Sequence, residues 1–242
     1  MYISNLMSLL CNEITMFDIN EISKLKKEKS SLEGKSTTEL KSIIRKLKTK
    51  VGYLKGTMEH PGYEELQRMP GFNKAAELEE AQIQLEKTID ALIKTGEPYK
   101  LSASELRAKK FDDNIQAIDK IMYGEERKFG NFEVRTYTIA EAHVLLDIKE
   151  FTKGICQEEL DRPKVFCAKE EFLAGLRELR IGEWRRNYDP SRFDCVVLDG
   201  IHWELEISFS NKCRPFNIQG TNSYPYNFKK FRKLLGLKNY ES

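Results

Sequence analysis

The stretch DCVVLDGIHWELEISFSNKCRPFNIQGTNSYPYNFKKFRKLLG, residues 194–236, decides the fold of this chain. Apolar and polar residues alternate over 202–209, which is typical of a strand with one buried side. Short runs at 195–198 and 215–219 predict two neighbouring strands, and the spacing of apolar residues over 227–235 predicts a helix. We therefore expect an antiparallel meander that is followed by a helix.

Three long helical patterns precede this stretch. They are expected over residues 36–56, 73–95 and 102–124. The first and the third begin with capping boxes, at Ser36 and Ser102, in which the Ser side chain accepts a backbone N–H and a Glu reaches back. Two Pro-Gly pairs in 60–72 mark the connection between the first and the second. We expect these helices to form a bundle or a coiled-coil hairpin.

Helices and strands are expected to follow one another between these helices and the opening stretch. Residues 131–137 alternate as a strand does, and a capping box at Thr138 predicts a helix that continues to residue 154. Further elements are expected at 164–166 (strand), 169–180 (helix) and 183–188 (strand). The expected fold class is α+β. Its parts are an N-terminal helical segment at 1–35, a helical bundle at 36–126 and an α+β domain at 127–242.

Composition indicates a globular protein of a reducing compartment. The chain has 242 residues and a formal net charge of +2, so no large overall charge attracts polyanions. The five cysteines are odd in number and form no CxxC pair, which favours reduced thiols. The apolar N-terminus lacks a basic region and is interrupted by Glu13, so we expect no signal peptide. No apolar run is long enough for a membrane span, and we expect a cytoplasmic protein.

Charge is distributed in blocks along the chain. Residues 20–56 contain 11 Lys or Arg and 4 Asp or Glu, whereas residues 57–99 contain 4 and 9. Residues 207–242 contain 7 Lys or Arg and 1 Asp or Glu. The first two blocks fit a basic helix that pairs with an acidic helix, either within one chain or between two copies in a homodimer.

No catalytic, metal or cofactor site is assigned from the sequence. There is no GxSxG motif, no phosphate-binding loop and no Cys/His cluster with zinc spacing. Cys195 and His202 could meet across a hairpin, but such a pair alone is weak evidence for a nucleophile. Asp199, Glu204 and Glu206 are similar to the strand carboxylates of metal-dependent nucleases, although the expected Lys is missing. The strict alternation favours another interpretation, in which Glu204 and Glu206 are the polar side of the strand.

A basic and aromatic surface near the C-terminus is the strongest functional candidate. On the last helix, the Phe and Leu side chains are expected to face inward, which leaves the basic residues toward solvent. Lys and Arg bind phosphates, and aromatic rings stack on bases or fill protein interfaces. The candidate binding residues are Lys229, Lys230, Arg232, Lys233, Tyr224, Tyr226, Arg214, Arg185 and Arg186.

An ordered set of residues runs through the same stretch. It consists of Leu198-Asp199-Gly200, Trp203, Leu205, Ile207, Asn211, Gly220, Asn222, Tyr224-Pro225, Asn227-Phe228 and Leu234. This order, an Asp-Gly-x-x-Trp strand pair followed by a Gly-x-Asn-x-Tyr-Pro-x-Asn-Phe turn into a helix, resembles a small module of uncharacterised proteins in Gram-positive bacteria and their phages or mobile elements. The module implies no catalytic residues. Physically, Asp199-Gly200 favours a tight turn, and Asn227 can cap the helix.

Charged helices, a compact module and the missing catalytic signature together resemble proteins with which phages and mobile elements block host machinery, such as anti-CRISPR proteins. We therefore expect a non-enzymatic binding protein without cofactors, in the cytoplasm of a bacterial host. Its expected partner is a host protein or ribonucleoprotein effector, with nucleic acid as a further partner of the basic patches. The alternatives are a metal-dependent nuclease or phosphodiesterase and a structural coiled-coil protein.

Overall fold

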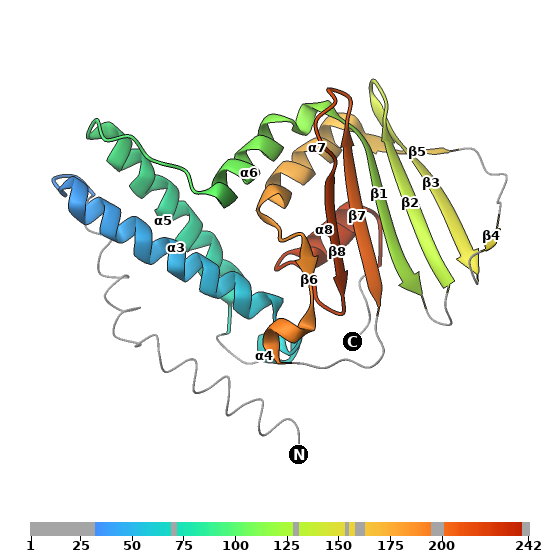
Figure 1. Cartoon of the computed structure of the whole chain (residues 1–242), viewed down its shortest axis with the longest axis horizontal. Coiled ribbons are helices and arrows are strands. Elements are labelled where there is room, and N and C mark those ends of the chain that lie inside the picture. Colours follow the sequence, from blue (N-terminus) through green and yellow to red (C-terminus); the bar gives the residue numbers. More distant parts are fainter. Residues whose placement is uncertain are drawn as a thin grey trace, which may run out of the picture. The chain divides into compact units, whose positions relative to one another are not determined.

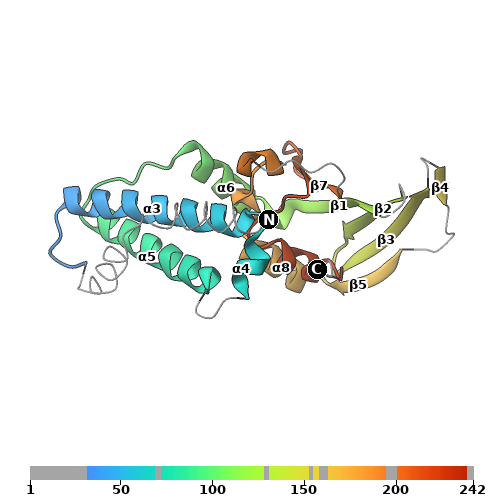
Figure 2. The ribbon, with the colours of Figure 1, turned by 90° about the horizontal axis from the view of Figure 1, so that it is seen from below.

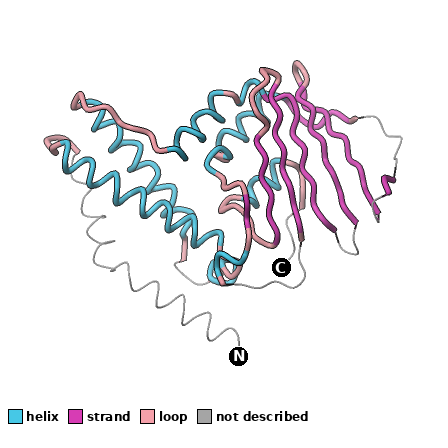
Figure 3. Tube along the Cα trace, in the orientation of Figure 1, coloured by secondary structure: helices cyan, strands magenta, loops and turns pink. Residues whose placement is uncertain are grey.

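The structure, a computed structural model, describes residues 32–68, 72–127, 131–152, 155–157, 163–194 and 201–238. Its helices are α3 (Thr37–Glu59), α4 (Tyr63–Gln67), α5 (Lys74–Lys94), α6 (Ala103–Asp113), α7 (Lys169–Glu178) and α8 (Phe228–Leu234), with short 3-10 turns η1 (Ile115–Ala117), η3 (Ile181–Glu183) and η4 (Pro190–Phe193). Its strands are β1 (Ile118–Arg127), β2 (Asn131–Ile139), β3 (His143–Thr152), β4 (Ile155–Gln157), β5 (Lys164–Ala168), β6 (Asn187–Tyr188), β7 (His202–Phe209) and β8 (Phe216–Thr221). This mixture of helices and strands (Figures 1 and 3) is consistent with the expected α+β class.

Contacts between Cα atoms divide the chain into two compact units. Among the described residues, the first unit contains 32–48 and 82–99, and the second contains the rest. Helices α3 and α5 therefore each contribute one part to each unit.

The first unit is built from antiparallel parts of α3 and α5. Its expected capping box is present, because Glu39 N donates to Ser36 Oγ (3.3 Å) and Ser36 N donates to Glu39 Oε2 (2.8 Å). Leu40 and Ile44 from α3 pack with Leu92 from α5 in a buried cluster. The basic helix thus pairs with the acidic helix within one chain.

In the second unit, the remaining parts of α3 and α5 pack against the turn that leads into α8. Leu54, Leu78 and Ala81 form a buried cluster, and Tyr226 packs against it. Lys55 forms an ion pair with Glu183, and its Nζ lies 4.9 Å from the centre of the Tyr226 ring. Apolar and charged contacts therefore join these helical parts to the sheet domain.

The sheet contains eight strands within the described residues. Their order is β4-β3-β2-β1-β7-β8-β6, and β5 lies beside β3. All paired strands are antiparallel except β6 and β8, which are parallel. The expected strands at 131–137, 164–166, 202–209 and 215–219 and the expected helices at 169–180 and 227–235 are confirmed.

Helices α7 and α8 cover one face of this sheet (Figures 1 and 2), which we call the inner face. Ile121, Leu205 and Ile207 point to it from the central strands. They are buried together with Phe172 from α7 and Phe231 from α8 in one large hydrophobic core. The opposite, outer face carries the side chains that alternate with these.

Two segments that were expected to be helical are strands in the structure. The helix expected over 102–124 ends at Asp113, and the residues from Ile118 onward form the central strand β1. The helix expected after Thr138 is replaced by the end of β2 and by β3. In both segments the apolar spacing fits a strand as well as a helix. Pairing with a strand on each side decides in favour of the strand, which shows that tertiary context overrides local propensity.

Smaller differences concern the connections. The strand expected at 183–188 is only two residues long, because η3 occupies Ile181–Glu183. The connection at 60–72 contains the short helix α4. The expected helical segment at 1–31 and the expected strand at 195–198, with Asp199-Gly200, lie outside the described residues. Within the described part of the chain, no helix is both long and apolar enough to span a membrane.

Candidate binding surface on helix α8

Helix α8 presents three lysines on one side. Lys229, Lys230 and Lys233 are exposed, whereas Phe228 and Phe231 are buried against the sheet. Because successive residues advance by about 100° around a helix, the three lysines lie within roughly 100° of arc. We call this surface the α8 basic face. Lys229 Nζ lies 2.7 Å from Glu64 Oε1, while Lys230 and Lys233 make no ion pair with the residues that the structure describes.

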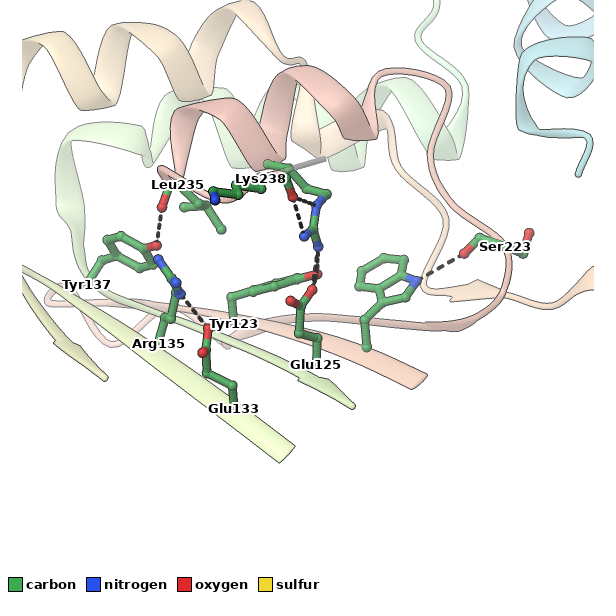
Figure 4. Close-up of polar contacts among 10 residues, drawn as sticks. Tyr123, Glu125, Glu133, Arg135, Tyr137, Ser223, Leu235 and Lys238 are labelled. Atoms are coloured by element: carbon green, nitrogen blue, oxygen red, sulfur yellow. Dashed lines mark hydrogen bonds and ion pairs between the residues drawn. The ribbon is translucent and has the colours of Figure 1, made fainter. Parts of the chain in front are cut away.

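Arg232 does not belong to this face, so the expectation that it faces solvent is wrong. Its side chain is only 5% exposed, and its Nη1 forms an ion pair with Glu125 and donates to Tyr123 Oη at 3.1 Å. Its Nε and Nη2 donate to the carbonyl oxygen of Lys238 at 3.1 and 2.6 Å (Figure 4). We call these contacts the Arg232 clamp. The physical reason is its position four residues after Phe228, on the buried stripe of the helix.

The clamp neutralises one of two carboxylates that lie opposite each other inside the protein. Glu125 on β1 and Glu133 on β2 are direct cross-strand partners, and each is 4% exposed. Like charges in this position destabilise a sheet. Arg232 pairs with Glu125, and Arg135 Nε lies 2.7 Å from Glu133 Oε1 (Figure 4), so each carboxylate has its own guanidinium.

A further buried contact fixes the C-terminal end of α8. The Tyr137 hydroxyl donates to the carbonyl oxygen of Leu235 at 2.6 Å (Figure 4). Burial raises the pKa of Tyr137 to about 12, because the ionised phenol would be poorly solvated there. The hydroxyl therefore remains a donor at neutral and moderately alkaline pH.

This pKa predicts a loss of stability at alkaline pH. An unfolded Tyr releases its proton near pH 10, whereas folded Tyr137 keeps it up to about pH 12, so the free energy of unfolding falls as pH rises between these values. By pH 11.5 the loss due to Tyr137 should reach about 2 kcal/mol. Urea denaturation of wild type and Tyr137→Phe at pH 9 and pH 11.5 checks this. Equal losses in both proteins would contradict it.

The turn before α8 is organised around Trp203 of β7. The indole Nε1 donates to the Ser223 carbonyl at 3.0 Å, and the ring centre lies 4.7 Å from that of Phe228. Gly220 leaves room for this ring, since a Cβ there would lie 2.6 Å from Trp203 Nε1. Asn222 has a left-handed φ of 47°, and its Oδ1 accepts the backbone N–H of the residue before β7 at 2.8 Å. The motif residues Trp203, Gly220, Asn222 and Phe228 thus each have a structural role.

Asn227 was expected to cap α8, but its side chain makes no capping hydrogen bond. Instead, its Oδ1 accepts from Trp184 Nε1 at 2.9 Å and its Nδ2 donates to the Leu179 carbonyl at 2.7 Å. Both partners are buried residues that need a polar contact, and the one amide side chain satisfies them. The start of α8 is therefore tied to the segment that follows α7.

The predicted aromatic residues support the turn more than they form a surface. Tyr224 is half-buried, and its ring stacks on Phe228 with centres 4.8 Å apart. Tyr226 is half-buried beneath Lys55. Arg214 is exposed just before β8, whereas the turn into α8 begins at the other end of that strand. Arg214 is therefore not brought to the α8 basic face.

The predicted basic residues Arg185 and Arg186 are exposed just before β6. Arg185 Nε lies 3.4 Å from Glu59 Oε2, and Arg192 Nη1 lies 3.1 Å from the same oxygen. Glu59 is buried, so it anchors both guanidiniums. Acidic residues of the chain itself therefore neutralise part of the basic surface that the sequence predicts.

Two of the three candidate strand carboxylates lie in the described part of the chain. Glu204 is exposed and Glu206 half-buried on the outer face, and they alternate with the buried Trp203, Leu205 and Ile207. Their interpretation as the polar side of the strand is confirmed, while Asp199 lies outside the described residues. Across the part of the chain that the structure describes, no group of three or more His, Cys, Asp or Glu could hold a metal ion.

The buried charges of β1 and β2 are not found by sequence reasoning. Glu125 and Tyr123 fall in the segment that was expected to be helical. Glu133 and Arg135 alternate with Phe132 and Val134, and this pattern marks a strand without saying which side faces the core. The signal for Arg232 was available, since its spacing from Phe228 and Leu235 places it on the apolar stripe.

We compared the chain with protein-family models, curated proteins and solved structures. No protein-family model, no curated protein and no solved structure matches this chain.

Proposed function

We propose that this chain is a binding protein whose α8 basic face contacts nucleic acid held in a host nucleic-acid-handling or defence complex. By binding this nucleic acid, the protein would block the complex, in the manner of the anti-CRISPR-like inhibitors of phages and mobile elements. The chain acts by binding and not by catalysis.

The proposal is supported by the way in which α8 is held. Asn227 fixes its start, and the Arg232 clamp and the Tyr137 hydroxyl fix its end. The backbone that carries the three lysines is thus ordered before any partner binds. Ordering a flexible backbone on binding costs free energy and lowers affinity. Because the backbone of α8 is already fixed, less of the attraction between lysine and phosphate is lost to this cost. Lysines that neutralise phosphates also release counterions, which favours binding.

Replacement of two lysines by glutamate should test this proposal. In Lys230→Glu/Lys233→Glu, attraction to phosphate becomes repulsion, and we expect affinity for labelled single-stranded RNA and duplex DNA to fall by about tenfold or more, which is 1.4 kcal/mol or more. Fluorescence anisotropy in about 50 mM salt, where such binding is strong, measures the change. The same variants are then used in pull-downs of purified nuclease effector complexes loaded with their nucleic acid.

The control is Lys100→Glu/Lys110→Glu, which changes charge equally at two exposed lysines outside α8. It should bind as the wild type does. If the wild type binds neither nucleic acid nor a loaded effector at low salt, or if both double variants lose affinity equally, the proposed role of α8 is wrong.

A further inference from the structure

The outer face of the sheet departs from the polar surface that is usual for an exposed antiparallel sheet. Phe132 and Val134 of β2 and Phe151 of β3 lie on it, and all three are half-buried. The residues that alternate with them, including Arg135 and Tyr137, face inward, as Figure 4 shows. Phe132 and Val134 therefore point away from α7 and α8.

These apolar residues form one continuous strip. Phe132 and Phe151 are direct cross-strand partners, and Val134 lies opposite Gly124. The Phe132 ring lies over Gly124, since a Cβ there would be only 2.7 Å from Phe132 Cζ. Met122 lies two residues before Gly124, on the same face of β1, and it is half-buried. We call Met122, Phe132, Val134 and Phe151 the outer apolar strip.

Carboxylates flank this strip on both sides. The register places Glu126 opposite Phe132, Glu204 opposite Gly124, Glu206 opposite Met122 and Asp147 opposite Thr136. Two lysines, Lys120 and Lys149, share the same face. Among the residues that the structure describes, four carboxylates against two lysines give the surround of the strip a net negative charge, which repels nucleic acid and attracts basic protein.

We infer that the outer apolar strip is a docking surface for a Lys- or Arg-rich segment of a partner protein. Protein interfaces combine an apolar, often aromatic centre with a polar rim, and this face has both. The sign of the charge on the rim selects the partner, because complementary charges speed association and like charges oppose it. The inference does not rest on the proposed function, since it concerns another face with the opposite charge. Proteins that handle nucleic acid carry such basic surfaces.

A titration with a model peptide tests the inference. The probe is a labelled peptide of alternating Leu and Lys, and its acidic counterpart has Glu in place of Lys. The wild type should bind the basic peptide and not the acidic one. Glu204→Lys/Glu206→Lys should lower the affinity for the basic peptide by about tenfold, because two attractive charges become repulsive. Val134→Thr keeps the branched shape and the strand propensity, and it should weaken binding a few-fold.

The control variant is Glu170→Lys/Glu178→Lys, with the same charge change at two exposed positions of α7. It should leave peptide binding unchanged, as should Lys230→Glu/Lys233→Glu, which separates this surface from the α8 basic face. Unchanged peptide affinity in Glu204→Lys/Glu206→Lys would overturn the inference. So would a wild-type dimer in light scattering that this double variant dissociates, since the occupant would then be a second copy.

Discussion

Glu125→Ala is expected to destabilise the protein by about 3–5 kcal/mol, the loss typical of a buried ion pair from which one partner is removed. The variant leaves the Arg232 guanidinium buried without its carboxylate, and it also removes the acceptor of the Tyr123 hydroxyl, which lies 2.8 Å from Glu125 Oε2. The free energy of unfolding from urea denaturation at neutral pH measures the effect. Because the clamp holds the end of α8, affinity for nucleic acid should fall as well.

Two further variants show whether the unpaired charge is the cause. In Glu125→Leu/Arg232→Met both charges are replaced by apolar groups, and this exchange is often neutral or stabilising, so it should cost less than Glu125→Ala. Glu170→Ala removes an exposed carboxylate from α7 and should change stability by less than about 0.5 kcal/mol. A Glu125→Ala protein as stable as Glu170→Ala would show that the clamp contributes little.

Trp203→Ala should cost a similar amount, about 3–5 kcal/mol, because it empties a large site in the core. The indole is completely buried, packs on Phe228, and holds the turn through the Ser223 carbonyl. Its loss should also release the start of α8. We expect the urea midpoint to fall strongly, and the amide protons of 220–228 to exchange faster with solvent.

His202→Ala is the matched control, since it truncates the neighbouring residue of the same strand, which points to the outer face. It should change stability by less than about 0.5 kcal/mol. Comparable losses in Trp203→Ala and His202→Ala would mean that the turn is not built on the indole.

Local sequence patterns correctly predicted those helices and strands whose pattern fits only one type of secondary structure. The capping boxes at Ser36 and Ser102 place the starts of α3 and α6, and the alternation over 202–209 places β7. The segments 118–127 and 143–152 fit both a helix and a strand. Their pairing in the sheet decides between the two. β1 pairs with β7, which lies far away in the sequence, and both segments pair with β2, which lies between them.

Local sequence patterns also predicted part of the candidate site. Helical spacing places Lys229, Lys230 and Lys233 outside, and the structure agrees. The same spacing places Arg232 on the buried stripe, but its charge led to the opposite prediction. Its burial is possible because Glu125 and the Lys238 carbonyl satisfy its charge and its donors, and the sequence does not reveal these partners. The direction of Phe132 also depends on contacts that no local pattern contains.

The salt dependence of nucleic-acid binding tests the central claim most directly. Each lysine that contacts a phosphate contributes about 1 to the slope of log K against log salt concentration. For Lys230→Ala/Lys233→Ala we expect this slope to be shallower than in the wild type by about 2, with Lys100→Ala/Lys110→Ala unchanged. An unchanged slope in Lys230→Ala/Lys233→Ala would contradict the claim that the α8 basic face binds nucleic acid.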